Sequence, residues 1–110
     1  MKVDYKDNSQ RILTAMEKGI KNGLEAIGLT AETYAKKATP VDTGRLRNSI
    51  SHAVDGEAVY IGSNVEYAPY VELGTSRAEA HHMLQKAATE HSAEYKRLAE
   101  DAVKSAINNI

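Results

Sequence analysis

The chain has 110 residues with 14 basic and 15 acidic side chains, so its formal net charge is −1. This length suits a single domain over residues 1–110, and the balanced charge does not predict sequence-specific nucleic-acid binding, which normally needs a basic excess. The sequence contains no cysteine, which excludes disulfides and thiolate metal sites. It also has neither a signal-peptide pattern nor an apolar stretch near the ~18 residues of a membrane span, so we expect it to stay in the cytosol where it is made.

The candidate core is thin. Alanine accounts for 16 residues, while phenylalanine and tryptophan are absent. Because burial stabilises by about 25 cal/mol per Å² of apolar surface, alanine-rich packing contributes little per residue. Small domains with such cores often depend on partner subunits. We therefore expect a homo-oligomer.

The first predicted element is a long helix over residues 8–38. Its apolar residues recur every three or four positions and form one stripe: Ile12, Met16, Ile20, Leu24, Ile27, Ala31, Tyr34 and Ala38. Pro40 should end the helix, because the residue before a proline avoids helical backbone angles. Gly19 and Gly23 are one turn apart and would let a second helix approach closely, while Gly28 leaves open a kink near residues 28–30.

A β-hairpin is predicted over residues 48–63. Ile50, His52 and Val54 alternate onto one face of the first strand, and Val59 and Ile61 share a face of the second. Asp55-Gly56 is a strong signal for a two-residue turn. The following residues, 65–73, could form an extra strand or a short helical turn over about 66–73. Pro69 argues against a central strand.

Residues 74–80 should form a polar loop, and a second long helix should run from about residue 80 to 108. Its apolar stripe comprises Leu84, Ala87, His91, Tyr95, Leu98, Ala102 and Ala106. The alanines Ala87, Ala88, Ala99 and Ala102 offer a narrow surface for the glycines of the first helix. The expected fold class is therefore α+β, with the C-terminal helix packed on the first helix and a small antiparallel sheet.

Asp42-Thr43-Gly44 allows two interpretations. Retroviral-type aspartic proteases use Asp-Thr-Gly, and two such carboxylates sharing a proton would form the catalytic pair. That motif, however, follows an apolar strand in a dominantly β chain, whereas here a helix and Pro40 precede it. The alternative is a turn in which Asp42 or Thr43 bonds its own backbone and Gly44 takes a positive φ.

No metal or cofactor site is predicted. His81, His82 and His91 lack the spacing of three residues between ligands that places two histidines on one helical face. A helix start and one half-buried histidine explain them better.

Two motifs bracket the hairpin and carry a resemblance to a known family. Thr39-Pro40-Val41-Asp42-Thr43-Gly44-Arg45-Leu46-Arg47-Asn48-Ser49-Ile50 precedes it, and Glu66-Tyr67-Ala68-Pro69-Tyr70-Val71-Glu72-Leu73-Gly74-Thr75 follows it. In this order and spacing they resemble the gene-product-ten-like family of siphophage tail-completion (neck) proteins, over roughly residues 8–100. Family members usually have Pro-Phe-Leu before the last helix, where this chain has His82-Met83-Leu84.

The resemblance implies a structural, non-enzymatic virion protein without cofactors. It would form a ring of six copies at the head–tail junction, between the head connector and the tail tube or tail terminator, and DNA could pass through that ring. Assembly would take place in the host bacterial cytoplasm. A retroviral-type protease and a free-standing cytosolic adaptor remain the alternatives.

The candidate site residues fall into two groups. The turn motif comprises Pro40, Asp42, Thr43, Gly44, Leu46 and Ser49, and the interface candidates are Tyr67, Tyr70, Glu72, Gly74, Thr75 and Arg77. Glu72 could accept hydrogen bonds from the Thr43 or Arg45 side of the first motif. The loop over residues 74–82 lacks a large apolar residue before its histidines, so we expect it to be mobile in the free protein and Arg77 to reach Glu66 or Glu72 of the next subunit.

Overall fold

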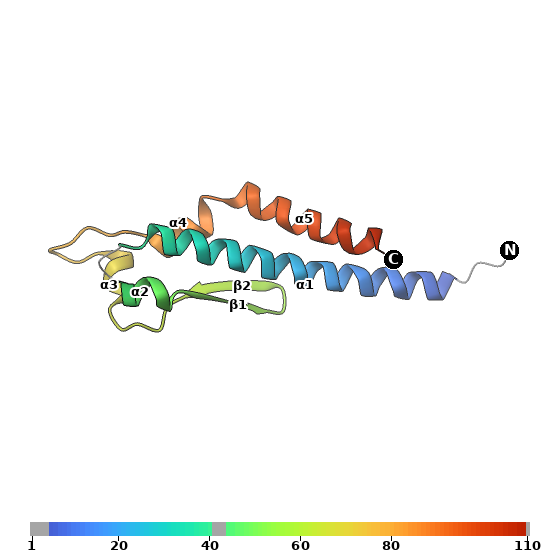
Figure 1. Cartoon of the computed structure of the whole chain (residues 1–110), viewed down its shortest axis with the longest axis horizontal. Coiled ribbons are helices and arrows are strands. Elements are labelled where there is room, and N and C mark those ends of the chain that lie inside the picture. The colour runs from blue at the N-terminus through green and yellow to red at the C-terminus, as the bar shows by residue number, and fades with distance from the viewer. Residues whose placement is uncertain (1–4, 41–43, 110) are drawn as a thin grey trace.

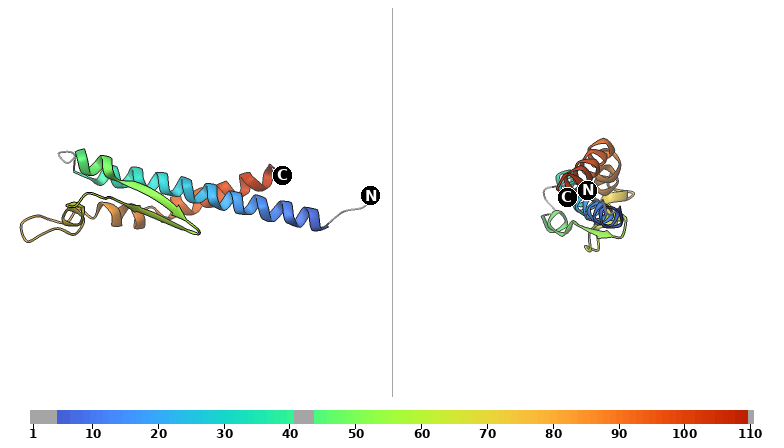
Figure 2. Two further views of the ribbon diagram at one scale, coloured as in Figure 1. Left: turned by 90° about the horizontal axis from the view of Figure 1, so that it is seen from below. Right: turned by 90° about the vertical axis from the view of Figure 1, so that its right-hand side faces the viewer.

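A computed structural model describes residues 5–40 and 44–109. The molecule is elongated, with principal extents of 73 × 23 × 19 Å. Helix α1 (Tyr5–Ala38) forms its long axis, and the β-hairpin and helix α5 (Ser92–Asn108) lie on opposite sides of it (Figures 1 and 2). The predicted α+β class is confirmed, and so is the packing of the long C-terminal helix on the first helix. Its predicted packing on the sheet is wrong for α5, because α1 lies between α5 and the hairpin.

Helix α1 begins and ends close to its predicted bounds. Its last residue is Ala38, two residues before Pro40, as the proline rule predicts. The helix continues without a break through Gly28, so the kink that the sequence left open does not form. Gly28 has another purpose, since a Cβ atom there would lie 2.4 Å from the ring of His52 on the hairpin. The glycine makes room for that ring.

The hairpin consists of strands β1 (Ser51–Asp55) and β2 (Ala58–Gly62), paired antiparallel. His52 lies opposite Ile61 and Val54 opposite Val59, so the predicted inner face is confirmed. The turn differs by one residue, because Asp55 pairs with Ala58 and the loop is Gly56-Glu57. Gly56 has φ of 60° and Glu57 does not share the positive φ, which fits a type II′ rather than a type I′ turn.

Residues 68–73 form helix α3 (Ala68–Leu73), so the helical alternative is confirmed and the extra strand is wrong. Within the described residues the sheet has two strands. Helix α2 (Gly44–Ser49) forms the second half of the first motif and leads into β1, so residues 48 and 49, predicted as part of the hairpin, are helical instead. One core cluster joins α2, α3 and the start of helix α4 (Met83–Thr89); its buried residues are Leu46, Val65, Ala68 and Met83.

The predicted single C-terminal helix is wrong in its continuity and its start. It begins at Met83 rather than near residue 80, and it breaks between α4 and α5 at Glu90 and His91. Neither proline nor glycine causes the break. Instead the His91 ring stacks on Tyr34 of α1, with centroids 3.5 Å apart, and the Tyr95 hydroxyl donates a hydrogen bond to the carbonyl of Ala87.

The break lets the two C-terminal helices use different parts of α1. Helix α4 packs beside the end of α1, where Ala35, Ile50 and Ala87 form a second buried cluster. Helix α5 packs at Gly19 and Gly23, where added Cβ atoms would lie 2.9 Å from the Val103 Cα and 3.2 Å from the Ala99 Cα. The predicted close approach of a helix at these glycines is confirmed for Ala99 and Ala102. The part assigned to Ala87 and Ala88 is wrong, because Ala87 packs elsewhere and Ala88 is exposed.

Candidate interaction surfaces

The first motif is described only in part. Pro40 follows the end of α1, whereas Asp42 and Thr43 lie outside the described residues, and so does their predicted turn. Gly44 is the first residue of α2 and has no positive φ, so that prediction is wrong. Its φ stays negative because the chain already enters a helix at this residue.

The two motifs meet at one end of the molecule. Arg45 holds Glu66 through two hydrogen bonds of 3.2 and 3.1 Å, and its guanidinium lies over the ring of Tyr67. Leu46 is fully buried against Val65 and Ala68. The Ser49 hydroxyl donates to the Leu46 carbonyl at 2.6 Å and also contacts the hydroxyl of Ser63. Contacts between the two motifs and the segment just before the second one thus hold this end of the molecule together.

Glu72 has a different partner from the one predicted. Its two carboxylate oxygens accept hydrogen bonds from the backbone amides of Leu84 at 2.8 Å and Gln85 at 3.0 Å. These amides belong to the first turn of α4, where backbone donors lack intrahelical partners and a negative charge is favoured. Glu66, rather than Glu72, faces Arg45. Glu72 therefore holds the start of α4 against α3.

The loop after α3 is tied at both ends. Gly74 has φ of 78° and ψ of 176°, and a Cβ atom there would lie 2.7 Å from the Ala80 nitrogen. Thr75 closes a turn by donating its amide to the Ala78 carbonyl at 2.9 Å. The amides of His81 and His82 donate to the carbonyls of Val71 and Glu72. The segment around Arg77 between these ties is exposed and projects from the end of the molecule (Figure 1).

The two tyrosines of the second motif lie in different environments. Tyr67 is half-buried and packs against the Leu46 cluster. Tyr70 and Leu73, by contrast, are 63% and 71% exposed on α3. Pro69 beside them is exposed as well. We call Pro69, Tyr70 and Leu73 the α3 face.

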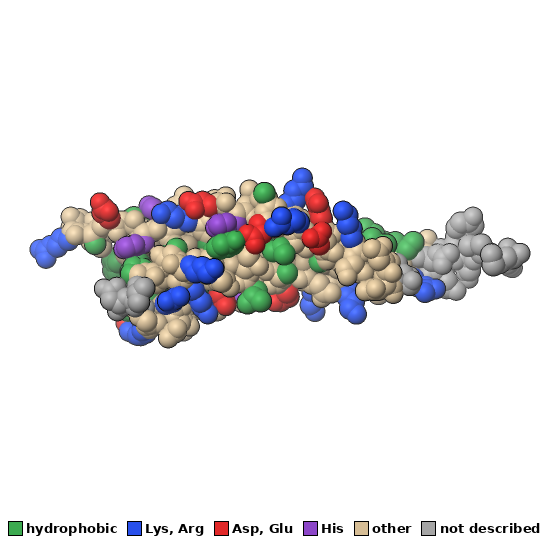
Figure 3. Space-filling view, turned by 45° about the horizontal axis from the view of Figure 1, so that its top comes forward, with side chains coloured by type: hydrophobic (Ala, Val, Ile, Leu, Met, Phe, Trp, Pro, Cys, Tyr) green, Lys and Arg blue, Asp and Glu red, His purple; other side chains and the backbone are tan. Residues whose placement is uncertain are grey.

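A second apolar surface lies near the other end of the molecule. In its N-terminal half the predicted α1 stripe is exposed at Ile12 (44%), Met16 (37%) and Ile20 (45%), and the adjacent Leu13 is 53% exposed. We call these four residues the α1 face. Figure 3 shows hydrophobic side chains at the surface toward that end. The periodicity of the sequence did not predict this exposure, because it identifies an apolar stripe without showing what covers it.

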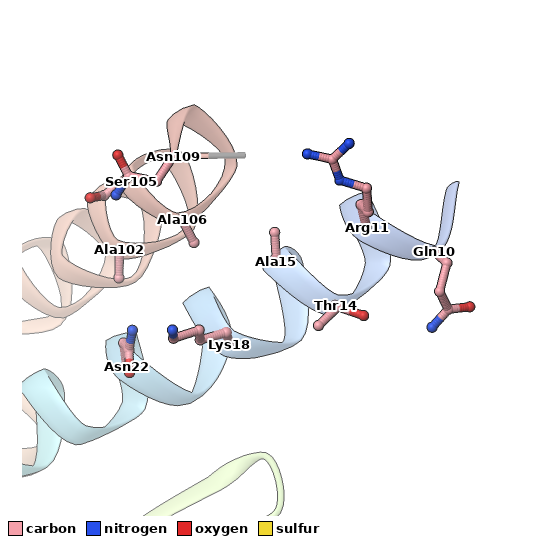
Figure 4. A pocket seen from close by; sticks show the side chains of 10 residues that line it. All are labelled: Gln10, Arg11, Thr14, Ala15, Lys18, Asn22, Ala102, Ser105, Ala106 and Asn109. Atoms are coloured by element: carbon pink, nitrogen blue, oxygen red, sulfur yellow. The ribbon is translucent and has the colours of Figure 1, made fainter. Parts of the chain in front are cut away.

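A groove of about 770 Å³ separates the N-terminal part of α1 from the end of α5. Ala15 faces Ala102 and Ala106 across it, and the polar side chains Arg11 and Lys18 line its α1 side (Figure 4). The groove gives this end of the molecule a positively charged flank.

His52 attaches the hairpin to α1. Its Nδ1 and Nε2 atoms each lie 3.2 Å from a carboxylate oxygen, of Glu32 and Glu25 respectively. Burial lowers the pKa of His52, but hydrogen bonds to Glu32 and Glu25 outweigh it, so the pKa is raised above its ordinary value. For Glu32 burial raises the pKa, yet the His52 hydrogen bond and Lys36 lower it overall. Sequence analysis missed this pairing.

The other three histidines lie in different environments. His81 is exposed, His91 is half-buried in the stack with Tyr34, and His82 precedes α4 with a left-handed φ of 49°. Among residues 5–40 and 44–109, no group of three histidine, cysteine or acidic side chains is placed to hold a metal ion. The helices of the same ranges include none that is long and apolar enough to cross a membrane.

Residues 4–74 match a family model described as "Bacteriophage HK97-gp10, putative tail-component". The match covers α1, α2, the hairpin and α3, together with both motifs up to Gly74. The chain belongs to this family of phage tail components. No curated protein and no solved structure matches the chain. The mainly helical fold also differs from the dominantly β chain that a retroviral-type protease requires.

Proposed function

We propose that this tail component is a structural protein that completes the phage neck by assembling into a ring. The ring contains six copies, lies between the head connector and the tail tube or tail terminator in the virion, and leaves a passage for DNA. Subunits are made and assembled in the host cytoplasm. The observation that supports this proposal best is an elongated subunit with a thin core and two exposed apolar faces, one toward each end.

The thin core and the exposed faces both favour a subunit that is covered by partners. Only three large side chains, Leu46, Ile50 and Met83, are fully buried among the described residues. Apolar faces left exposed on a small subunit are typical of surfaces that a partner covers. A structural subunit needs such faces, while a free-standing cytosolic adaptor would expose them to solvent for most of its life.

The first test is the state of the purified protein and its place in the particle. Mass photometry over a concentration series and negative-stain microscopy should show discrete rings. Mass spectrometry of purified virions, with immunogold labelling, should locate the protein at the neck. A protein that stays monomeric at every concentration and is absent from virions would contradict the proposal and favour the adaptor.

The protease alternative has a separate test. Asp42→Asn should leave ring assembly near that of the parent, because asparagine is as well suited to turns as aspartate. A peptidase activity in the parent that disappears in Asp42→Asn would replace the structural interpretation. The matched control is Asp55→Asn, a change of the same chemistry on the hairpin.

A further inference from the structure

We propose that His52 controls, in response to pH, how the β-hairpin docks on α1. As an imidazolium it holds the distal half of the hairpin, residues 53–60, against the helix, and the loss of its Nε2 proton releases that half. The proposal concerns the single subunit, so it goes beyond the proposed function and does not depend on it.

The position of the His52 ring is fixed by the helix beneath it. The ring lies against Gly28, where any larger side chain would collide with it. Its Nδ1 atom is 3.2 Å from a carboxylate oxygen of Glu32, and its Nε2 atom is 3.2 Å from one of Glu25. Because these glutamates are separated by about two turns of α1, the ring bridges them and engages both of its nitrogens.

This geometry suits only the doubly protonated ring. An imidazolium donates a hydrogen bond from each nitrogen, whereas a neutral imidazole keeps one lone pair, which would face a carboxylate in either tautomer. Burial opposes the charged form, but the hydrogen bonds to Glu32 and Glu25 outweigh it and raise the pKa of His52. The docked hairpin therefore stabilises the imidazolium, and the imidazolium stabilises docking.

The other charged groups near the ring do not replace this contact. On α1, Lys36 bonds Glu32 at 3.4 Å, while Glu25 has no such basic neighbour among the ion pairs of the described residues. Tyr60, the titratable side chain of β2, is exposed on the outer face of the hairpin, and Asp55 of β1 is exposed at the turn. A neutral ring would thus leave two carboxylates beside it with one lysine to offset them.

The contact of Nε2 with Glu25 is the one that deprotonation breaks. The Glu32 side chain is 17% exposed and is also held by Lys36, whereas the Glu25 side chain is 55% exposed and can turn to solvent. The neutral ring should therefore keep its proton on Nδ1, toward Glu32. Glu25 is the glutamate nearer to the hairpin turn, because the turn points along α1 toward its N-terminus (Figure 1).

The two halves of the hairpin differ in their remaining support. At the base, Ile61 packs against the second buried cluster, which is independent of the charge on His52. Beyond His52 the inner face consists of Val54 and Val59, and both are only half-buried. A two-stranded hairpin with little packing is marginally stable in water. Deprotonation should therefore loosen residues 53–60 and leave the base docked.

NMR spectroscopy of the full chain tests both steps. Nitrogen shifts of the His52 ring report its protonation and its tautomer, and we expect a midpoint above about 6.5, the value of a free histidine, with the neutral ring protonated on Nδ1. Amide protection of residues 53–60, corrected for intrinsic exchange, should fall severalfold through the same midpoint. Protection of residues 44–50 should not change. By linkage, the loss of protection cannot exceed the factor by which docking strengthens proton binding to His52.

Variants of the two glutamates give an independent readout. Glu32→Gln and Glu25→Gln each remove one charge and keep the shape of the side chain, so both should lower the midpoint of His52, Glu32→Gln by more. In His52→Gln the protection of residues 53–60 should no longer depend on pH. His81→Gln, at an exposed histidine, is the matched control and should behave like the parent.

Four results would overturn the proposal. The first is a His52 midpoint at or below that of a free histidine, and the second is a neutral ring protonated on Nε2. The third is a raised midpoint through which the protection of residues 53–60 stays constant, since the ring would then titrate without moving the hairpin. The fourth is loss of the pH response in His81→Gln as complete as in His52→Gln. None of these results bears on the proposed ring, which microscopy tests separately.

Discussion

Gly74 is the residue at which the backbone depends most on glycine. Its φ of 78° with ψ of 176° lies in a region that side chains scarcely enter, and the Ala80 nitrogen would lie 2.7 Å from an added Cβ. We expect Gly74→Ala to destabilise the subunit by about 1–3 kcal/mol. Chemical denaturation measured by circular dichroism provides the free energies of unfolding.

Gly44→Ala is the control for that prediction. Gly44 has no positive φ and no atom within 4 Å of an added Cβ, so the change should stay within about 0.5 kcal/mol of the parent. If the two substitutions cost the same, the backbone conformation assigned to Gly74 is wrong.

Glu72 gives a second prediction at the residue scale. Glu72→Ala removes the acceptor for the amides of Leu84 and Gln85 and should cost about 1 kcal/mol, as the loss of other helix caps does. Glu72→Gln keeps one acceptor oxygen and should cost less. Glu90→Ala, at an exposed carboxylate, is the control. A Glu72→Ala protein as stable as the control would show that the cap contributes nothing.

These residues also show where sequence reasoning succeeded and failed. Both motifs were recognised, but a positive φ was predicted for Gly44, because Gly44 follows turn-forming residues. The positive φ occurs instead at Gly74, directly after a short helix, which is a common position for glycine. The partners of Glu66 and Glu72 were beyond the sequence. These partners depend on how α3 and α4 pack. In the sequence, nothing distinguishes the future partner of one glutamate from that of the other.

At the scale of elements, the hairpin is attached to α1 by a titratable contact. The pKa of His52 is higher in the folded than in the unfolded protein. The contribution of His52 to the free energy of unfolding is therefore complete below the unfolded pKa of about 6.5, and it is lost as pH rises through the higher pKa of the folded state. The pKa of Glu32 is lower in the folded than in the unfolded protein. Its contribution to the free energy of unfolding is therefore present above the unfolded pKa of about 4.3, and it is lost as pH falls through the lower pKa of the folded state. The attachment is therefore strongest in mildly acidic solution.

We expect the parent to be more stable than His52→Gln near pH 6, by a difference of order 1 kcal/mol, and this difference should shrink on going to pH 8.5. Glutamine keeps hydrogen-bonding capacity but does not titrate. Comparison of the two proteins across pH isolates the contribution of residue 52. A difference that is constant with pH would show that His52 is held by packing alone.

The helices show which parts of an element a sequence pattern can predict. The spacing of apolar residues predicted α1, and their alternation predicted the hairpin. The glycines Gly19 and Gly23 correctly predicted where a second helix packs on α1. The break between α4 and α5 was not predictable, because local propensity favours a continuous helix there. It arises from a tertiary contact, the stack of His91 on Tyr34, between residues 57 positions apart.

At the scale of the whole molecule, the apolar stripe of α1 serves two purposes along its length. In its C-terminal half Ala31 and the adjacent Ala35 are buried, where α4 and the hairpin pack on α1, whereas Ile12, Met16 and Ile20 in its N-terminal half are exposed. Periodicity distinguishes an apolar face from a polar one, but it does not say whether the chain itself or a neighbour covers that face. Only the count of covering elements, which the structure provides, separates these cases.

This division predicts a gradient of hydrogen exchange along α1. In the monomer, backbone amides of residues 9–20 should exchange faster than those of residues 28–38, because helix ends with few buried contacts open at low free-energy cost. In the assembled protein the amides of residues 9–20 should slow markedly, while those of residues 28–38 should change little. Uniform protection of α1 in a verified monomer would contradict this prediction. So would exchange in residues 9–20 that assembly leaves unchanged. The gradient follows from the same feature that makes the subunit elongated: among the described residues, the N-terminal part of its longest helix packs mainly on α5, whereas the C-terminal part packs on both α4 and the hairpin.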